Sequence, residues 1–456
     1  MCSSREIEME YVTEPARQVP VRYSADVCVC GGSCTGLFAA IRAARMGMKV
    51  LVIEASNRLG GTATNGLVNV WHSLMDDTYS YPVIAGLTLE TEKRMEKAGR
   101  IGYAQDDASI GARLDPVYLS FLLDDMAREE GVDVLFHTRY AGLVTENKRI
   151  SHICIDNIDG MSAVKADFYI DATGDGCLCR DIGMEGRRAA LPQPPSACFL
   201  MTGDSADEDM ASLLAEHGAE FGLTDDWGWY GSVPGHDGLY MRADNHVFGA
   251  DCATANGLSR AETEGRRTAF ALEKLLDTYG KRKHRIVNLC SHVGVREAER
   301  YRTAYTMTDD DLLLTRRFDD AILQGTYRLD RHHQEDNGIT FRYINGEYVT
   351  YYGKGEREVR GNWRKERGIT QQAGHFYSMP FKTLVQDRAA NFCPAGRMIG
   401  CEDGAYGALR VMVNCNQMGE AAGTVAAMCL REKRDIWDID GRRLKEELNR
   451  GGSCLR

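Results

Sequence analysis

Residues 26–54 read DVCVCGGSCTGLFAAIRAARMGMKVLVIE. The stretch divides into an apolar strand, a glycine-rich turn, a helix rich in Ala and Arg, and a second apolar strand, at 26–30, 31–36, 37–46 and 49–53. Gly47 follows the helix as the residue type that most often ends one, and Glu54 closes the second strand. A strand, a helix and a strand in this order form a βαβ unit, so we expect a parallel sheet with a right-handed crossover.

The glycine-rich turn has the spacing of a dinucleotide-binding fingerprint. Gly31, Ser33 and Gly36 occupy its three positions, with Ser33 in place of the central glycine, and Glu54 follows Gly36 by 18 residues. A helix N-terminus presents unpaired N–H groups to a pyrophosphate, and a carboxylate after the second strand can accept hydrogen bonds from ribose hydroxyls. The Ser33 side chain either binds a phosphate or loosens the fit. The alternative is a turn that packs helix on strand without any ligand.

Three later segments indicate FAD rather than a nicotinamide cofactor. They are LGGTAT at 59–64, DATGDG at 171–176, and 395–410, where AGR and GALR precede a helix. A domain that binds a nicotinamide cofactor does not need three further segments of this kind to contact its ligand. An extended FAD does, because one part of the chain binds the pyrophosphate while distant parts surround the flavin.

Together these segments resemble the family of FAD-dependent oxidoreductases, which is related to flavoproteins with a glutathione-reductase-type FAD domain and to fumarate-reductase-like flavoproteins. The resemblance covers nearly the whole chain. Beyond the segments above, it rests on TEPAR at 13–17, ARLDP at 112–116, RAE at 260–262, GRR at 265–267, GVRE at 294–297, Asp330, His332 and LRVM at 409–412.

The resemblance implies an α/β fold, in which a Rossmann-like FAD-binding domain with a parallel sheet is interrupted by a mixed α+β substrate domain. The FAD-binding domain comprises 20–185 and a return segment at 386–432, the substrate domain 186–385, and a C-terminal tail 433–456. The glycine-rich turns add Ser33, Cys34 and Thr62 to the FAD contacts. The contacts that the resemblance carries over are Gly31, Gly32, Gly36, Glu54, Gly60, Gly61, Thr173, Gly174, Asp175, Gly396 and Arg397.

Two positions depart from the family pattern. The family carries His in the loop after the AGR segment, where this chain has EDG at 402–404, and the usual Pro of the last helix is Val413. Asp403 is therefore a candidate to replace that histidine as a base, which would change the chemistry at the flavin face.

His332 is the leading candidate for acid–base catalysis, because it matches a family position beside Asp330; a structural histidine is the alternative. Arg296 and Arg300 are four residues apart and would share one face of a helix if this stretch is helical. They would then either bind an anionic substrate such as a carboxylate or pair with neighbouring glutamates.

The last helix is expected to begin near Ala408, with its N-terminus directed at the pyrimidine edge of the flavin. Arg410 would bind substrate or flavin there, or form a structural ion pair. Tyr406 is a further candidate, as a hydrogen-bond donor to a substrate oxygen.

Composition narrows the functional class. Lys and Arg number 55 against 66 Asp and Glu, a net charge of −11, which disfavours nucleic-acid or anionic-membrane partners. No apolar run approaches the ~18 residues of a membrane span, and residues 1–25 lack the apolar core of a secretory signal, so we expect a cytoplasmic protein. Its 15 cysteines are expected to be reduced, and Cys28 and Cys30 to face one side of a buried sheet, so no metal site is expected.

The sequence thus predicts an oxidoreductase that transfers a hydride between a small organic substrate and FAD; the alternative is an electron-transfer or reductase subunit that works with a partner protein. No second fingerprint follows a strand, so oxygen, a quinone or another redox protein is a better electron acceptor than a nicotinamide. The polar, aromatic-rich middle segment favours a hydroxylated or sugar-like substrate, and a homo-oligomer is compatible with the sequence. A halogenase would carry GWxWxIP, whereas Trp227 and Trp229 have different spacing.

Overall fold

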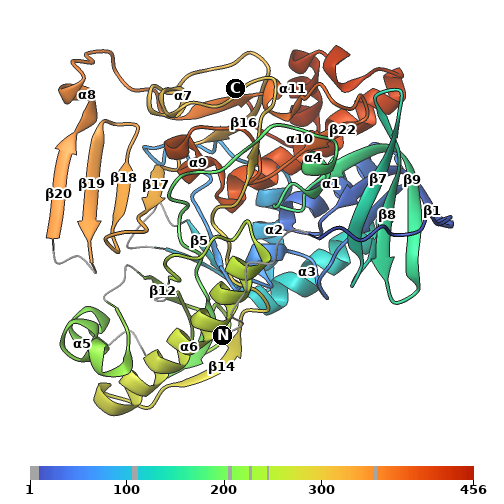
Figure 1. Cartoon of the computed structure of the whole chain (residues 1–456). Helices are drawn as coiled ribbons and strands as arrows, with labels where there is room; N and C mark the ends of the chain where they lie inside the picture. Colours follow the sequence, from blue (N-terminus) through green and yellow to red (C-terminus); the bar gives the residue numbers. More distant parts are fainter. Residues whose placement is uncertain (1–9, 105–110, 204–207, 225–227, 244–245, 354–356) are drawn as a thin grey trace.

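The computed structural model describes residues 10–104, 111–203, 208–224, 228–243, 246–353 and 357–456. Figure 1 shows a central sheet with its helices on the right, an antiparallel sheet at the left edge, and a smaller unit of strands and helices below. Distant parts of the chain meet at the centre, where helix α1 (Cys34–Arg45) packs against α10 (Met412–Glu432).

Seven described strands form the central sheet, in the order β6-β2-β1-β9-β8-β7, with β22 paired to the end of β9. Their bounds are Val21–Cys30 (β1), Val50–Ile53 (β2), Asp133–Leu135 (β6), Arg139–Glu146 (β7), Arg149–Asn157 (β8), Gly160–Asp171 (β9) and Phe392–Pro394 (β22). Strand β1 runs parallel to both β2 and β9; β6 is parallel to β2, and β22 is parallel to the end of β9. Strand β8 pairs antiparallel with β7 on one side and with the first half of β9 on the other. The expected βαβ unit and its parallel strands are therefore present.

The side chains of β1 alternate between two hydrophobic cores. Val27 and Val29 belong to the core that contains α1 and α10, while Cys28 and Cys30 face the opposite core, beneath the β7–β9 layer. All four side chains are fully buried. The two cysteines thus share one face of a buried sheet, as predicted, and are free thiols.

The ends of α1 are set by its flanking residues. Ser33 is the N-cap, and its Oγ accepts a hydrogen bond from the Gly36 N–H at 3.4 Å. Gly47 follows the helix with a φ of +83°, a left-handed conformation that favours glycine, as predicted.

Glycines in α10 allow it to lie directly against α1. A Cβ at Gly419 would collide with the carbonyl oxygen of Thr35, and a Cβ at Gly423 with that of Ala39. The two helix axes approach closely because these positions carry no side chain.

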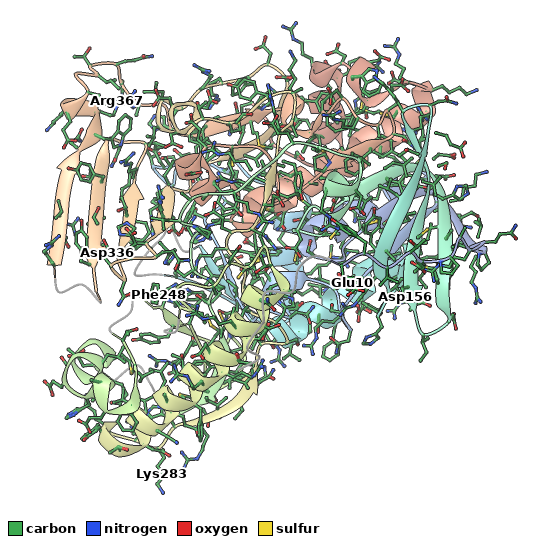
Figure 2. The ribbon with its side chains drawn as sticks, in the orientation of Figure 1. Glu10, Asp156, Phe248, Lys283, Asp336 and Arg367 are labelled. Carbon is green, nitrogen blue, oxygen red and sulfur yellow. The ribbon has the colours of Figure 1, made fainter. Side chains whose placement is uncertain are left out.

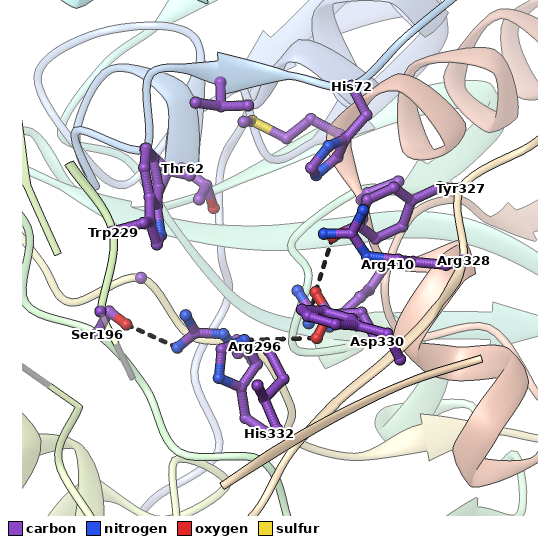
Figure 3. A pocket seen from close by; sticks show the side chains of 18 of the residues that line it. Thr62, His72, Ser196, Trp229, Arg296, Tyr327, Arg328, Asp330, His332 and Arg410 are labelled. Atoms are coloured by element: carbon purple, nitrogen blue, oxygen red, sulfur yellow. Dashed lines mark hydrogen bonds and ion pairs between the residues drawn. The ribbon is translucent and has the colours of Figure 1, made fainter. Parts of the chain in front are cut away.

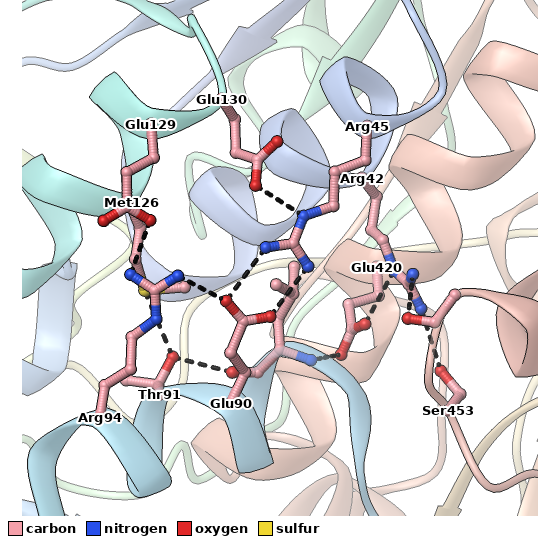
Figure 4. Close-up of polar contacts among 12 residues, drawn as sticks. Arg42, Arg45, Glu90, Thr91, Arg94, Met126, Glu129, Glu130, Glu420 and Ser453 are labelled. Atoms are coloured by element: carbon pink, nitrogen blue, oxygen red, sulfur yellow. Dashed lines mark hydrogen bonds and ion pairs between the residues drawn. The ribbon is translucent and has the colours of Figure 1, made fainter. Parts of the chain in front are cut away.

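A buried ion pair joins the same two helices to α11 (Gly441–Arg450), as Figure 4 shows. The Nε of Arg42 on α1 lies 2.9 Å from a carboxylate oxygen of Glu420 on α10. The Nη atoms of Arg42 donate to the carbonyl oxygens of Gly451 and Leu448, at 2.5 and 3.2 Å, and to the Ser453 hydroxyl at 3.3 Å. We call this arrangement the Arg42–Glu420 clamp.

Two four-stranded antiparallel sheets flank the centre, in the orders β12-β13-β11-β14 and β17-β18-β19-β20. The first packs against α5 (Met210–His217) and α6 (Ala255–Tyr279); in Figure 2, Lys283 marks the far end of this unit, and Arg367 the end of the second sheet near α8 (Trp363–Glu366). The strand bounds are Phe199–Thr202 (β11), Tyr230–Ser232 (β12), Leu239–Arg242 (β13), Arg285–Leu289 (β14), Leu329–His332 (β17), Ile339–Arg342 (β18), Glu347–Tyr352 (β19) and Arg357–Asn362 (β20).

Smaller elements complete the described chain. The short strands are Val70–Trp71 (β3), Ile101–Tyr103 (β4), Ala112–Leu114 (β5), Gly186–Arg187 (β10), Arg300–Tyr301 (β15), Ala321–Gly325 (β16) and Tyr377–Pro380 (β21). The remaining helices are Gly86–Lys97 (α2), Pro116–Glu129 (α3), Cys177–Asp181 (α4), Asp309–Leu313 (α7) and Asp403–Leu409 (α9), with 3₁₀ turns at Gly61–Ala63 (η1), Gly218–Phe221 (η3), Phe381–Leu384 (η4) and Ile436–Asp438 (η5). No described helix has the length and apolar character to cross a membrane.

Three local features differ from the sequence-based expectations. The last long helix does not begin near Ala408, which lies in α9; Val411 is extended, with ψ of 146°, and α10 begins at Met412. The segment from Arg296 to Arg300 is not helical, so these two arginines do not share a helix face. The segment 433–456, expected as a tail, contains η5 and α11, and the side chains of Ile436, Leu444 and Leu448 in these elements are buried in the main core.

Candidate functional site

The carboxyl ends of β1, β2, β9 and β22 surround a cavity of about 330 Å³, which we call the cofactor cavity. All the predicted cofactor residues except Gly32 and Gly36 line it. It is also lined by residues outside that prediction: Thr35, Ala172, Leu258, His292, Val293, Val295, Ala395, Arg410, Met412, Cys415 and Asn416.

Gly32 and Gly36 shape the cavity from behind its wall. The Gly32 N–H donates to a carboxylate oxygen of Glu54 at 2.6 Å, and the other oxygen accepts from the Ser56 N–H at 2.7 Å. A Cβ at Gly36 would collide with the carbonyl oxygen of Gly31. The first glycine thus orients the carboxylate, and the second lets α1 begin directly against the strand end.

Asp171 organises the second turn, although the sequence did not predict a separate role for it. It is fully buried, and it accepts hydrogen bonds from the Thr173 N–H and hydroxyl at 3.1 and 2.7 Å and from the N–H groups of Leu178 and Cys179 at 2.8 and 3.1 Å. Burial raises the pKa of Asp171, and these hydrogen bonds oppose the rise. Its position at the end of β9, before a glycine turn, is the signal that could have identified it.

Several donors and acceptors at the cofactor cavity suit an extended, phosphate-bearing ligand. Both amide atoms of Asn416, the Arg397 Nη1 and the Arg410 Nε are buried without a hydrogen-bond partner. Both α1 and α10 begin at this cavity, so two helix N-termini offer positive partial charge to it. Arg397 is oriented by Asp175, 2.6 Å away. The residues present therefore fit FAD.

Two buried thiols lie in this wall. Cys34 lies at the start of α1 and Cys415 in the first turn of α10. Burial raises the pKa of each thiol to about 12, so neither is a thiolate near neutral pH. Ser33 caps α1, as described above, which accounts for a serine at the central fingerprint position.

A second cavity of about 590 Å³ adjoins the first, and we call it the arginine cavity. Residues that line both cavities are Thr62, Val295, Arg397, Arg410 and Met412. Its walls combine guanidinium groups with aromatic rings, from Arg113, Arg296, Arg328, Arg397, Arg410, Trp229, Tyr230, Tyr327, Phe341, Tyr343 and Tyr351, among others.

An ordered set of polar contacts lies at the base of this cavity (Figure 3). Asp330 accepts a hydrogen bond from the Tyr327 hydroxyl at 2.8 Å, and the same carboxylate oxygen lies 3.4 Å from the Arg410 Nη2. Arg296 donates from Nη1 to the Pro194 carbonyl at 2.8 Å and to the Ser196 hydroxyl at 2.7 Å. Both arginines are therefore held in fixed orientations.

His332, the predicted acid–base residue, lines the arginine cavity at the end of β17. Its Nε2 lies 3.5 Å from Asp330, and its ring centroid is 4.7 Å from that of His246. Burial, together with the charge of Arg296 and other neighbours, lowers the pKa of His332 well below its usual range. The imidazole is therefore neutral at neutral pH.

The remaining predicted residues lie elsewhere. Asp403 lines a different cavity, and Arg300 approaches it to 2.5 Å. Burial would raise the pKa of Asp403, but the hydrogen bond and charge of Arg300 lower it. Tyr406 is buried, and its hydroxyl donates to the Arg296 carbonyl at 2.7 Å rather than into a cavity. The interpretation of Asp403 as a flavin-facing base is thus not supported, because an arginine already neutralises it.

Arg300 is held by other residues of the protein. It is buried, with Nη2 also 3.1 Å from Glu297, and Nη1 donating to the Cys401 carbonyl at 2.8 Å. Of the tryptophan pair, Trp229 lines the arginine cavity, whereas Trp227 lies outside the described residues.

A sequence model of the protein family described as FAD dependent oxidoreductase matches residues 26–448. No curated protein matches the chain. Among solved structures, a geranylgeranyl bacteriochlorophyll reductase-like protein from Thermoplasma acidophilum is 13% identical, with 94% of this chain and 82% of that chain covered and a TM-score of 0.46. The flavin-dependent brominase Bmp2 is 11% identical (94% and 83% covered, TM-score 0.45), and the myxobacterial chondrochloren halogenase CndH 14% (94% and 79%, TM-score 0.44).

Proposed function

This chain belongs to the FAD dependent oxidoreductase family, and from that premise we propose that it transfers a hydride between bound FAD and a small organic substrate held in the arginine cavity. One observation carries the proposal. The cofactor cavity and the arginine cavity share a wall at Thr62, Val295, Arg397, Arg410 and Met412, so molecules in the two cavities would meet. A cavity of several hundred Å³ lined by aromatic and a few polar groups is typical of a small-molecule site.

The FAD contacts proposed for this chain follow from the cofactor cavity. The turns at Gly31–Gly36 and 173–176 and the N-termini of α1 and α10 would hold the pyrophosphate and flavin, and Glu54 the ribose. When bound, FAD supplies a ring that accepts or gives a hydride.

The residues of the chain would supply position and charge. Arg397 and Arg410 place positive potential at the shared wall, next to the N-terminus of α10. His332 is neutral and can accept a hydrogen bond from the substrate. Arg296 is fixed by Pro194 and Ser196 and can orient a substrate anion.

The test is the visible spectrum of the purified protein, recorded before and after anaerobic addition of pooled alcohols, sugars, acids and amines. We expect flavin absorbance that one pool bleaches. A colourless protein that does not bind added FAD would contradict the cofactor assignment. A yellow protein that no pool bleaches would instead favour a reductase or a subunit that works with a partner protein.

A further inference from the structure

The side chain of Asn416 is buried at the cofactor cavity without hydrogen bonds to the described chain. It lies near the start of α10, is 1% exposed and lines the cavity. Among the described residues, neither its Oδ1 nor its Nδ2 has a hydrogen-bond partner. A buried amide without partners is unfavourable, so native proteins nearly always satisfy one with a protein atom, an ordered water or a ligand. Asn416 therefore indicates a bound group in this cavity.

A second asparagine on the same helix has a different environment. Asn414 is also buried, but its Nδ2 donates to the Tyr377 hydroxyl at 3.1 Å and to the Ala408 carbonyl at 2.9 Å. The described residues that line the cofactor cavity include Asn416 and not Asn414. The amide of Asn414 thus joins parts of the protein, whereas that of Asn416 is placed for a ligand.

The position of Asn416 on α10 indicates which part of FAD it meets. Met412, Cys415 and Asn416 share one face of the helix, and all three line the cofactor cavity. Gly419 continues this face and packs against the Thr35 carbonyl at the start of α1. Met412 is also one of the residues at the wall shared with the arginine cavity, and Asn416 is not. Asn416 therefore lies between the shared wall and the start of α1.

An extended FAD would pass this position with its ribityl chain. In the proposed arrangement the N-terminus of α1 binds the pyrophosphate, and the flavin ring lies at the shared wall. The ribityl chain joins these two parts of the cofactor and carries hydroxyl groups. A hydroxyl both donates and accepts hydrogen bonds, so it matches an amide that offers donors and an acceptor. A phosphate only accepts, and would leave Oδ1 without a partner.

We propose that the side-chain amide of Asn416 binds the ribityl hydroxyls of FAD and so holds the flavin ring at the shared wall. This inference rests on the cofactor assignment within the proposed function, but not on hydride transfer. The sequence did not predict Asn416, because it predicts cofactor contacts from glycine turns at strand ends. An asparagine inside a helix gives no comparable signal.

The first experiment removes the ribityl hydroxyls one at a time. The full chain is stripped of flavin and titrated with FAD and with its 2′-, 3′- and 4′-deoxyribityl analogues, and the change in flavin fluorescence is recorded. We expect at least one analogue to bind the wild type about 10-fold more weakly than FAD does, since a buried hydrogen-bond partner is lost. In Asn416→Leu, FAD should bind at least about 10-fold more weakly than in the wild type, and the same analogue should bind within about 3-fold of FAD.

The second measurement is the stability of the flavin-free chain. Asn416→Leu removes polar atoms that lack partners there, so this variant should unfold at the same urea concentration as the wild type or at a higher one. Asn416→Ala repeats both tests without adding volume.

Asn414→Leu is the matched control. It removes two hydrogen bonds within the protein, so its flavin-free chain should unfold at lower urea concentrations than the wild type. The deoxyribityl analogue should remain about 10-fold weaker than FAD in this variant, as in the wild type.

Two results would overturn the proposal. One is equal binding of FAD and all three analogues by the wild type; the other is an equal loss for an analogue in the wild type and in both Asn416 variants. N3-methyl FAD tests the flavin ring in the same way: if only this analogue loses affinity, and only when Asn416 is present, the amide binds the ring and not the ribityl chain. A wild-type chain that binds no FAD would instead contradict the proposed function itself.

Discussion

The cofactor cavity and the arginine cavity meet at one wall, yet the chain builds them from different parts. The first is made chiefly of backbone, from glycine turns at strand ends and the first turns of α1 and α10. The second is made of long side chains that arrive from β5, the start of β12, the stretch 294–296 and β17. Backbone sites need glycine at set spacings, which a sequence displays; side-chain sites need segments to meet in space.

The largest effect is expected from a single methyl group at the cofactor cavity. In Gly36→Ala the added Cβ would collide with the Gly31 carbonyl oxygen, so α1 must move away from the strand end. We expect FAD affinity to fall more than ~100-fold, since a shift of the helix N-terminus removes several phosphate contacts. Flavin content and FAD titration of the apoprotein measure this.

Gly218→Ala is the matched control. Gly218 is also helical, in η3, and a Cβ there would make only ordinary contact, at 3.5 Å from the nearest atom. This variant should keep its flavin. If Gly36→Ala binds FAD as the wild type does, the close approach of helix and strand is not what the cofactor requires.

The next effect concerns the Arg42–Glu420 clamp that holds α1 against α10. Glu420→Gln leaves Arg42 buried without its carboxylate, and we expect a loss of about 3 kcal/mol in the free energy of unfolding. The flavin should dissociate at lower denaturant concentrations than in the wild type, because both helix N-termini face the cofactor cavity. Urea unfolding followed by circular dichroism and flavin fluorescence measures both quantities.

Glu90→Gln provides the contrast. Glu90 pairs with Arg45, three residues after Arg42 on the same helix, but these side chains are 27% and 31% exposed (Figure 4). Water screens such a pair, so we expect a loss below about 1 kcal/mol. Equal losses in the two variants would show that burial of the clamp does not matter.

The smallest effect is a pH dependence that belongs to the arginine cavity. His332 has a lowered pKa in the folded protein because of burial and nearby positive charge, so below its unfolded pKa of about 6.5 the unfolded chain binds more protons. The contribution of the neutral His332 to the free energy of unfolding is therefore lost as the pH falls below about 6.5. Denaturation midpoints at pH 7.5 and 5.5 should differ less in His332→Gln than in the wild type; an equal or larger difference would contradict this.

Most residues that the sequence predicts to contact FAD line one cavity, because Gly31, Glu54, Gly174 and Gly396 each lie where a strand ends; their contact with FAD stays a prediction. The catalytic candidates Arg296, His332 and Arg410 all line the arginine cavity, and their roles also stay predictions. Their joint arrangement was not predictable, because the contacts of Arg296 with Pro194 and Ser196 join segments about a hundred residues apart.

The helix expected to begin near Ala408 begins at Met412 instead, and the same break in the helix affects the position of Asp403. The family pattern suggested Asp403, and the helical pattern suggested a helix that begins near Ala408, but the extended residue Val411 separates α9 from α10. Asp403 therefore lies at the start of α9, within reach of Arg300, while α10 begins at the cofactor cavity with Met412. Nothing in the local composition distinguishes one long helix from two.

The residues of the Arg42–Glu420 clamp are synthesised at very different times. The ribosome makes Arg42 378 residues before Glu420 and 409 residues before Gly451. A growing chain on the ribosome therefore holds the fingerprint turn and α1 long before the partners that fasten this helix exist. We expect the nascent protein to acquire its flavin only after Glu420 and Gly451 have been made, so a ribosome stalled before these residues would carry a colourless chain.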